Sequence, residues 1–270
     1  MNARELTDQI AAKLAAEVRR NGDIIPYIAE DGVYKTDMRQ KNLSWWTNGF
    51  WAGLLWQMYH AVGVAEFKAT AEKTEGWLDE AMADFTGLHH DVGFMWMLSA
   101  VADYRLTGNE KSRIRAMHAA TLLAGRYNPN GRFLRAWNGD KTGWMIVDCL
   151  MNLSLLYWAS DETGDPRYAE IAQNHADTAL RVLLRPDGSC NHIAVLDPVT
   201  GELTGAPAGQ GYAPGSSWSR GQSWAVYGFA LSAKHTGETR YLEAAKRSAH
   251  YFIANAATHN WEPLVDFLAP

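Results

Sequence analysis

The sequence predicts an all-α protein built as a toroid of paired helices. Three observations favour this fold class: four very apolar helical segments, an amphipathic helical segment after each of them, and a glycine between the two. A helix that is apolar on nearly every side is typical of a buried position, and a helix with one apolar stripe is typical of an outer layer. Inner and outer helices that alternate along a chain close naturally into an α/α toroid.

The helical segments follow one another in a regular order. An amphipathic helix is expected over residues 2–20, and four pairs of an inner and an outer helix come after it. The inner helices are expected at residues 49–63, 91–108, 147–164 and 220–237, and the outer helices at residues 62–78, 107–123, 163–180 and 236–253. This makes nine helices, and the only strand pattern is a hairpin around residues 192–203.

The outer helices of the last two pairs are visibly related in sequence. "TGDPRYAEIAQNHADTAL" (residues 163–180) and "TGETRYLEAAKRSAHYFI" (residues 236–253) share Thr-Gly, Arg-Tyr and the helical stripe that follows. An internal repeat of this length indicates one supersecondary unit used several times. We therefore expect residues 1–270 to form a single toroid domain.

The connections between the helices are unequal in length. The turn from each inner helix to its outer helix is short, whereas the segments that lead to the inner helices are long: residues 21–48, 83–90, 126–145 and 185–219. Because the helices alternate in direction, the long segments all lie at one end of them. Long connections in a compact domain are usually functional.

The turn glycines align the four repeats and single out one position in each. Counting back 16 or 17 residues from Gly63, Gly108, Gly164 and Gly237 leads to Trp46, Asp91, Asp148 and Arg220. All four positions lie at the start of an inner helix, where the side chains face the axis of the predicted toroid. We expect them to line a cavity that the long connections surround.

The two aspartates allow different interpretations. An aspartate at a helix start is ordinarily an N-cap, and Asp91 fits that role. Asp148 lies within "MIVDCLM", where apolar neighbours desolvate the carboxyl group and favour its protonated form, as general acid catalysis near neutral pH requires. His89 and His90 precede Asp91, but adjacent residues rarely converge on one metal ion and no HExxH spacing is present. No metal is expected, and without a phosphate or dinucleotide motif no cofactor is expected either.

The composition narrows the class of protein. The chain has 270 residues, 47% of them hydrophobic, and a formal net charge of −5, so neither nucleic acid nor a membrane is an expected partner. The two cysteines have no metal-type spacing and are expected to be reduced thiols of a cytoplasmic protein. Twelve tryptophans, several of them in loops beside polar residues, suggest a cleft that binds sugar.

Four motifs resemble a known family of enzymes. "WWTNGFWAGLLW", "HHDVGFMWMLSA", "VDCLMNLSLLYWA" and "GSSWSRGQSWAVYGFAL" are similar to segments of the unsaturated glucuronyl hydrolases, family 88 of the glycoside hydrolases. The resemblance runs over residues 20–256 and implies a six-hairpin α/α toroid. It also implies an activity, which is release of the terminal 4,5-unsaturated uronic acid from oligosaccharides made by polysaccharide lyases. The reaction is an acid-catalysed hydration of the C4=C5 double bond of this sugar.

The resemblance assigns roles to seven residues. It implies that Asp148 is the general acid and base and that Asp91 is a second essential carboxylate. The substrate-binding residues it implies are Trp46, His192, Gln210, Arg220 and Trp224. The expected partner is an unsaturated uronyl oligosaccharide, and no metal or cofactor is required.

Two departures from the family keep other functions open. Six hairpins need twelve helices, so the chain is expected to lack its last hairpins and to expose an apolar seam, which would favour a homo-oligomer. The loop "GAPAGQGYAPG" is also less polar than is usual in the family. One alternative is an unsaturated rhamnogalacturonyl hydrolase, and another is a truncated, non-catalytic remnant that binds sugar.

Overall fold

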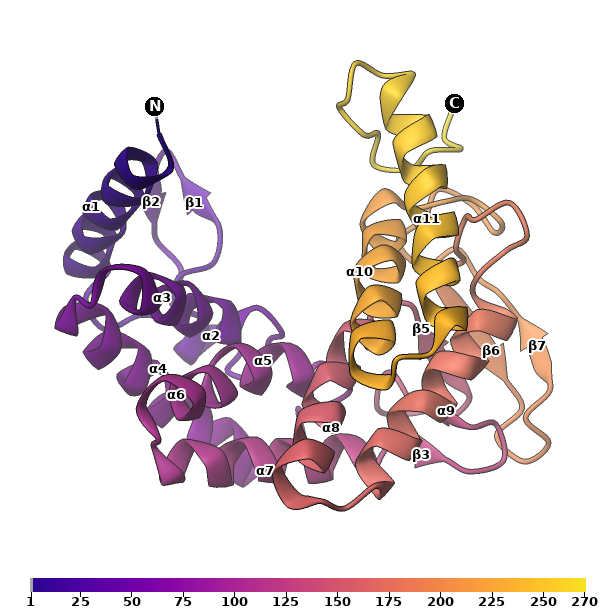
Figure 1. Ribbon diagram of the computed structural model, residues 1–270, viewed down its shortest axis with the longest axis horizontal. Helices are drawn as coiled ribbons and strands as arrows, with labels where there is room; N and C mark the ends of the chain where they lie inside the picture. The colour runs from indigo at the N-terminus through magenta and orange to yellow at the C-terminus, as the bar shows by residue number, and fades with distance from the viewer. Residues whose placement is uncertain (1) are drawn as a thin grey trace. The chain divides into compact units, whose positions relative to one another are not determined.

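The computed structural model describes residues 2–270, which form eleven helices and seven short strands (Figure 1). Two compact units share the chain, one ending at Ala119 and the other comprising Ala120–Pro270. The elements of the first are α1 (Ala3–Asn21), β1 (Ala29–Glu30), β2 (Val33–Tyr34), α2 (Met38–Lys41), α3 (Asn48–Val62), α4 (Ala65–Asp84), α5 (Val92–Leu98), α6 (Ala100–Thr107) and α7 (Glu110–Ala124), whose last turn crosses the boundary. Those of the second are β3 (Tyr127–Asn128), β4 (Phe133–Leu134), β5 (Trp144–Ile146), α8 (Cys149–Thr163), α9 (Arg167–Val182), β6 (Ile193–Leu196), β7 (Leu203–Gly205), α10 (Ser219–Thr236) and α11 (Thr239–Ala257).

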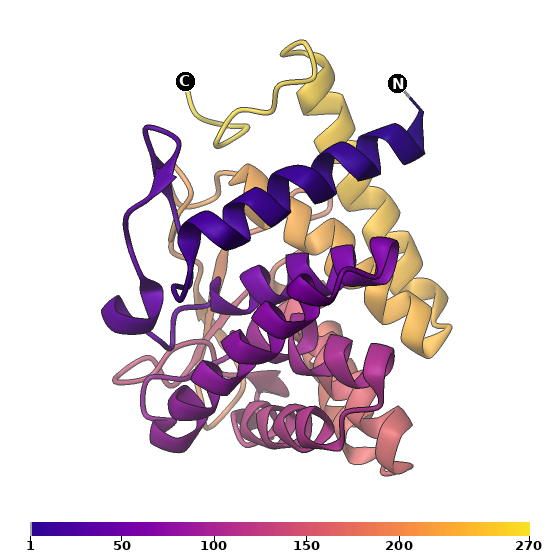
Figure 2. The ribbon, with the colours of Figure 1, turned by 90° about the vertical axis from the view of Figure 1, so that its left-hand side faces the viewer.

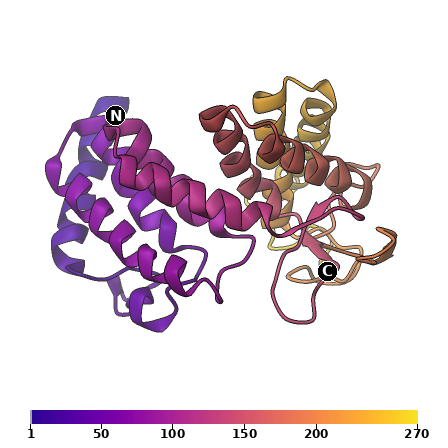
Figure 3. The same cartoon turned by 90° about the horizontal axis from the view of Figure 1, so that it is seen from below.

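Three of the four predicted helix pairs pack as expected. In the first unit α3 packs against α4, and α1 lies against both of them, as Figure 2 shows from that side. In the second unit α8 packs against α9 and α10 against α11, with α10 also beside α8 (Figure 3). The turn glycines Gly63, Gly108, Gly164 and Gly237 all have φ between 71° and 75°. Each ends its inner helix in the left-handed conformation, which glycine adopts without strain.

The second inner helix is not continuous, contrary to the expectation for residues 91–108. It is broken at Ser99, whose φ of −99° and ψ of −84° separate α5 from α6. The Ser99 hydroxyl donates a hydrogen bond to the carbonyl oxygen of Met95 at 2.6 Å. A side-chain hydroxyl that bonds back to the preceding turn bends a helix, and here it accompanies a full break.

The structure contains more strands than the single hairpin that was predicted. The expected hairpin is confirmed as β6 and β7, but β5 pairs with the other edge of β6 and makes a three-stranded antiparallel sheet. Two further two-stranded ribbons, β1–β2 and β3–β4, were not predicted. Strands of two or three residues are too short for a period of two to stand out in the sequence.

The inner helices were predicted to be buried on nearly every side. This holds for α8, but α3 and α10 each expose a large apolar side chain. In α8 the residues from Leu153 to Ala159 are all buried. In α3 and α10, by contrast, Leu54 and Tyr227 are each 56% exposed.

Both cysteines are free thiols in the core of the second unit. Among residues 2–270, no helix combines the length and the apolar character that crossing a membrane requires.

A buried polar network joins the four helices α3, α4, α6 and α7. Glu75 of α4 is 1% exposed, and its Oε1 accepts a hydrogen bond from the Trp56 indole at 2.8 Å. The Ser112 hydroxyl lies 2.7 Å from Oε2 of Glu75 and 2.6 Å from Oδ2 of Asp103, which is fully buried. One hydroxyl has a single proton, so it cannot donate to both carboxyl groups. One of the two carboxyl groups must therefore carry a proton.

The proton belongs to Glu75. Burial, with a smaller contribution from the charge of Asp103, raises the pKa of Glu75 to about 7, against hydrogen bonds from Ser112 and Trp56 and the charge of Arg115. Asp103 accepts two further side-chain hydrogen bonds, from Thr107 and Asn109, each at 2.7 Å.

We predict that this network makes the protein less stable at alkaline pH. A carboxyl whose pKa is raised by folding stabilises the fold fully below its unfolded pKa, and this contribution is lost as the pH rises through about 7. Between pH 5 and pH 9 the free energy of unfolding is expected to fall by about 2 to 3 kcal/mol because of Glu75. The measurement is the urea midpoint as a function of pH.

The variant Glu75→Gln should flatten this dependence, because an amide keeps the shape and has no proton to lose. Glu66→Gln is the matched control, since Glu66 lies on the same helix in a solvent-exposed pair with Arg19. Equal pH slopes for the wild type and Glu75→Gln would contradict the prediction.

Candidate active site

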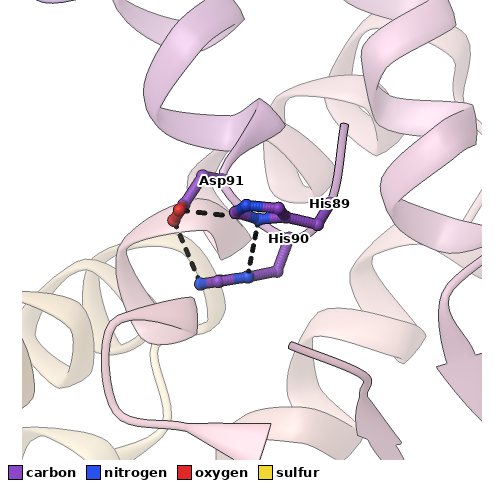
Figure 4. A group of neighbouring side chains, drawn as sticks. All are labelled: His89, His90 and Asp91. Carbon is purple, nitrogen blue, oxygen red and sulfur yellow. Dashed lines mark hydrogen bonds and ion pairs between the residues drawn. The ribbon is translucent and has the colours of Figure 1, made fainter. Parts of the chain in front are cut away.

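Asp91 and two histidines form a compact cluster in the first unit (Figure 4). Oδ1 of Asp91 lies 3.0 Å from Nε2 of His90, and Oδ2 lies 3.6 Å from Nδ1 of His89. The two imidazole rings stack at 4.9 Å with Nδ1 atoms 3.2 Å apart. Asp91 is the N-cap residue of α5, but its side chain makes no capping hydrogen bond. The simple capping role is therefore wrong, and the carboxylate faces the imidazoles.

The same three residues are the group that comes nearest to a metal site within residues 2–270. One ligand atom from each of them lies within 4.8 Å of the others. A tetrahedral zinc ion with ligands at about 2.1 Å would bring its ligand atoms to within about 3.4 Å of one another. The contacts within the cluster, at 3.0 to 3.6 Å, have the lengths of hydrogen bonds and ion pairs. That the chain needs no metal stays a prediction.

Trp46 contacts two phenylalanine rings, one of them in α5. It precedes α3, and its ring centre is 5.4 Å from that of Phe94 and 5.5 Å from that of Phe50. Phe94 is one helical turn beyond Asp91 in α5, so the two side chains share a face. A Cβ atom on Gly49 would come within 2.3 Å of the Met95 carbonyl oxygen, so glycine is what permits α3 to approach α5 this closely.

In the second unit, the unpredicted strand β5 brings Asp148 to His192. Residues 144–146 pair with β6, and the Val147 amide continues the ladder by donating to the His192 carbonyl oxygen at 3.0 Å. The chain then enters α8 with Asp148 as its N-cap residue, again without a capping hydrogen bond. Oδ2 of Asp148 lies 3.4 Å from Nε2 of His192, and the side chains are 15% and 2% exposed. The pairing of β5 with β6 explains why Asp148 and His192, 44 positions apart in the sequence, lie close together.

Gln210 settles which nitrogen of His192 carries the proton. The backbone amide of Gln210 donates a hydrogen bond to Nδ1 of His192 at 2.9 Å. An atom that accepts a hydrogen bond has no proton, so the neutral ring carries its proton on Nε2, which faces Asp148. Gly209 has a φ of 61°, and a Cβ there would lie 2.0 Å from Nδ1. The close approach of this loop to the ring therefore requires glycine.

Arg220 completes a connected set of polar groups. It is the second residue of α10, and its guanidinium donates to Oε1 of Gln210 at 2.7 Å. The same group lies 4.5 Å from the ring centre of Trp218, which in turn lies 4.6 Å from the His192 ring. The structure thus brings together four of the residues predicted from the sequence. Trp224 is one turn beyond Arg220 in the same helix and is half-buried.

A cavity of about 460 Å³ opens at this network. It is lined by Trp137, Lys141, Trp144, His192, Ile193, Pro207, Gly209 and Gln210. The ring centres of Trp137 and His192 lie 6.4 Å apart. Trp137 and Trp144 were not among the predicted site residues. Trp137 lies in a loop and Trp144 begins β5, and both belong to the polar connection 126–145, where tryptophan is the signal for sugar binding that the sequence offers.

Asp266, near the C-terminal end, holds the loop that carries Gln210. Its two carboxylate oxygens accept hydrogen bonds from the amides of Tyr212, Ser217 and Leu268 and from the Ser216 hydroxyl, at 2.7–3.0 Å. Burial acts to raise the pKa of Asp266, but these donors outweigh it and hold the pKa below its ordinary value. Nothing in the sequence pattern marked this residue.

With this geometry in view, the chain can be compared with known proteins. The sequence model of the family described as Glycosyl Hydrolase Family 88 matches residues 19–258. The chain belongs to this family. The assignment agrees with the four motifs and with the pairs of helices in both units.

Curated members of family 88 extend beyond the region that the chain matches. An unsaturated glucuronyl hydrolase of Bacillus sp. (strain GL1) is 38% identical over 245 residues, which is 89% of this chain and 64% of that protein. An unsaturated chondroitin disaccharide hydrolase of Streptococcus pyogenes serotype M1 is 38% identical over 212 residues, which is 77% of this chain and 53% of that protein. The chain therefore spans about half to two thirds of the length of these relatives.

Solved structures of family 88 share the fold. The crystal structure of the Bacillus sp. GL1 enzyme matches 98% of this chain with a TM-score of 0.89 and 34% identity, and 71% of that chain is covered. An unsaturated glucuronyl hydrolase from Streptococcus agalactiae matches 93% of this chain and 64% of its own with a TM-score of 0.84 and 32% identity. The predicted fold class, an α/α toroid of helical hairpins, is confirmed.

Proposed function

We propose that the chain releases the terminal 4,5-unsaturated uronic acid from lyase-generated oligosaccharides of the glycosaminoglycan type. The observation that carries the proposal is the pairing of Asp148 with a His192 ring whose proton faces it, beside a cavity with tryptophan in its wall. The names of the relatives support it, since they describe hydrolases of unsaturated glucuronyl and chondroitin substrates.

Asp148 is the proposed general acid. Its proton passes to C4 of the substrate, the electrons of the C4=C5 bond form the new C–H bond, and positive charge develops at C5 and the ring oxygen. The resulting carboxylate then takes a proton from a water molecule as that water adds to C5. The Nε2–H group of His192 lies 3.4 Å from Oδ2, and its partial positive charge is proposed to stabilise the carboxylate between these two steps.

The product of water addition is a hemiketal at C5. It opens to a ketone and leaves a hemiacetal at C1, which collapses and expels the leaving sugar. One carboxyl group serves as acid and then as base, so the reaction does not need the two carboxylates at a set separation that ordinary glycoside hydrolysis uses.

The remaining predicted residues are proposed to bind or orient the substrate. Arg220 and Gln210 present donors next to His192, and the rings of Trp46 and Trp224 are proposed to stack on sugar faces. Asp91, held by two imidazoles, is proposed as the second essential carboxylate.

The test follows the absorbance of the conjugated double bond. Unsaturated chondroitin and hyaluronan disaccharides should lose this absorbance when the protein is added, and an unsaturated disaccharide from pectin should lose it much more slowly. Faster loss with the pectin-derived substrate would favour the rhamnogalacturonyl alternative. Binding of a disaccharide, measured by calorimetry, without any loss of absorbance would favour a non-catalytic protein that binds sugar.

We also propose that residues 1–270 act as a single catalytic domain in the cytoplasm, with no nucleic acid partner. The net charge of −5 and two buried free thiols support this setting.

A homo-oligomer is proposed through exposed apolar side chains such as Leu54 and Tyr227. Size-exclusion chromatography with light scattering tests it, and a monomer at micromolar concentration would exclude it.

A further inference from the structure

Lys141 lies in the wall of the cavity, and its ammonium group contacts two indole rings. Its Nζ is 4.1 Å from the ring centre of Trp144 and 5.3 Å from that of Trp137. The two rings meet edge to face, 5.9 Å apart at 62°. An ammonium group at such distances is attracted to the faces of the rings, and its three N–H groups remain able to donate hydrogen bonds.

The loop that carries Lys141 is held by its own backbone. The Ala136 amide donates to the Trp144 carbonyl oxygen at 2.8 Å, and the Trp144 amide donates to the Lys141 carbonyl oxygen at 3.3 Å. The Arg135 guanidinium donates to the Gly139 carbonyl oxygen at 2.7 Å. The position of the ammonium group is therefore set by the fold and by two aromatic contacts.

Lys141 differs from other lysines of the protein in its charged neighbours. Lys111 and Lys246 lie 3.4 Å and 2.8 Å from carboxylates of Asp79 and Glu243. Among residues 2–270, no acidic side chain lies within ion-pair distance of Lys141, which is half-buried. A fixed, uncompensated positive charge at a cavity wall favours an anionic group of the ligand.

The side chains of the site follow one another from Asp148 to Lys141. Asp148 contacts His192, the His192 ring lies 6.4 Å from Trp137, and Trp137 lies 5.3 Å from the ammonium group. One indole thus separates the reacting end of the site from Lys141. With the reacting sugar at Asp148 and His192, as the proposed function requires, we place the leaving sugar toward Trp137 and Lys141, the remaining part of the cavity wall.

We infer that Lys141 selects substrates whose leaving sugar carries an anionic substituent, a sulfate or a carboxylate. The inference rests on the proposed function and adds to it a residue that sets specificity. Lys141 acts on the choice of substrate and takes no part in moving the proton.

The experiment compares kcat/KM for unsaturated disaccharides that differ only in the leaving sugar. The substrates are the unsulfated, 4-sulfated and 6-sulfated chondroitin disaccharides, and a disaccharide whose leaving sugar carries a carboxylate. The wild type should prefer one of the anionic forms. In Lys141→Met, which keeps the length and loses the charge, the ratio of kcat/KM for that form to kcat/KM for the unsulfated one should fall about tenfold, as loss of a charge-assisted hydrogen bond predicts.

Two variants act as controls. Lys141→Arg keeps the charge and should retain most of the preference. Lys234→Met removes an exposed charge in the last turn of α10 and should leave the ratio unchanged. A ratio that is the same in Lys141→Met and in the wild type overturns the inference, whichever substrate is fastest.

Calorimetric binding of the same disaccharides separates this inference from the proposed function. Turnover by the wild type with no effect of Lys141→Met on the ratio supports the function and overturns the role of Lys141. A wild type without turnover whose binding preference for the anionic disaccharide depends on Lys141 overturns the proposed function and supports anion selection. Binding without such a preference overturns the role of Lys141 as well.

Discussion

Asp148→Asn is expected to lower kcat by about 10²–10⁴-fold, because an amide cannot deliver the proton that starts the reaction. The variant keeps the shape of the side chain, and the cavity wall formed by Trp137, Trp144 and Gln210 is untouched. The substrate should therefore still bind, and KM should change much less than kcat. The measurement is the initial rate of absorbance loss with an unsaturated chondroitin disaccharide at saturating concentration.

Asp161→Asn is the matched control for this substitution. Asp161 lies on the same helix, α8, and its side chain is 74% exposed, so the same chemical change there should leave kcat within about twofold. Turnover by Asp148→Asn within about tenfold of the wild type would show that another group supplies the proton.

Asp266→Ala is expected to lower the free energy of unfolding of the protein by about 3 to 5 kcal/mol, since it leaves buried donors without an acceptor. Asp266 is 3% exposed and accepts four hydrogen bonds, three of them from the loop that follows Gln210. Loosening this loop should also raise KM, because the amide that fixes the His192 ring belongs to Gln210. Urea denaturation and steady-state kinetics measure the two effects.

The pH dependence of this effect has a definite sign. Folding lowers the pKa of Asp266, so its stabilising contribution is present above the unfolded pKa and is lost as the pH falls below it. The difference between wild type and Asp266→Ala should therefore shrink in acid. Asp197→Ala is the control: Asp197 accepts two amides in a surface turn, and its loss should change the urea midpoint much less. Equal losses from the two substitutions would rule out the special role of Asp266.

The helical framework was predictable because each of its signals is local. The glycines that end the inner helices are marked by residues within one turn, and the left-handed conformation at Gly63, Gly108, Gly164 and Gly237 bears this out. Counting back from them located Asp148 and Arg220 at the start of their helices. The break at Ser99 was missed, because a serine within an apolar helix bonds back to the helix in some contexts and not in others.

The site was only partly predictable. His192 and Gln210 were chosen through the resemblance, since their own neighbourhoods contain nothing that marks catalysis. Trp137 and Lys141 were missed, although tryptophan in a polar loop was recognised as a sign of sugar binding. The role of Asp266 could not be predicted from the sequence, because its hydrogen-bond donors come from a segment some 50 residues earlier in the chain.

The sequence by itself determined the helix pairs, their turns and the carboxylates at the starts of two inner helices. Periodicity and turn chemistry act over a few residues, so one chain is enough to reveal them. The tertiary structure decided what those carboxylates face. The pairing of β5 with β6 sets Asp148 against His192, the approach of Gly209 fixes the proton on Nε2, and the loop before β5 leaves Lys141 without a counter-charge. Each of these depends on contacts between distant segments, whose energies no local pattern records.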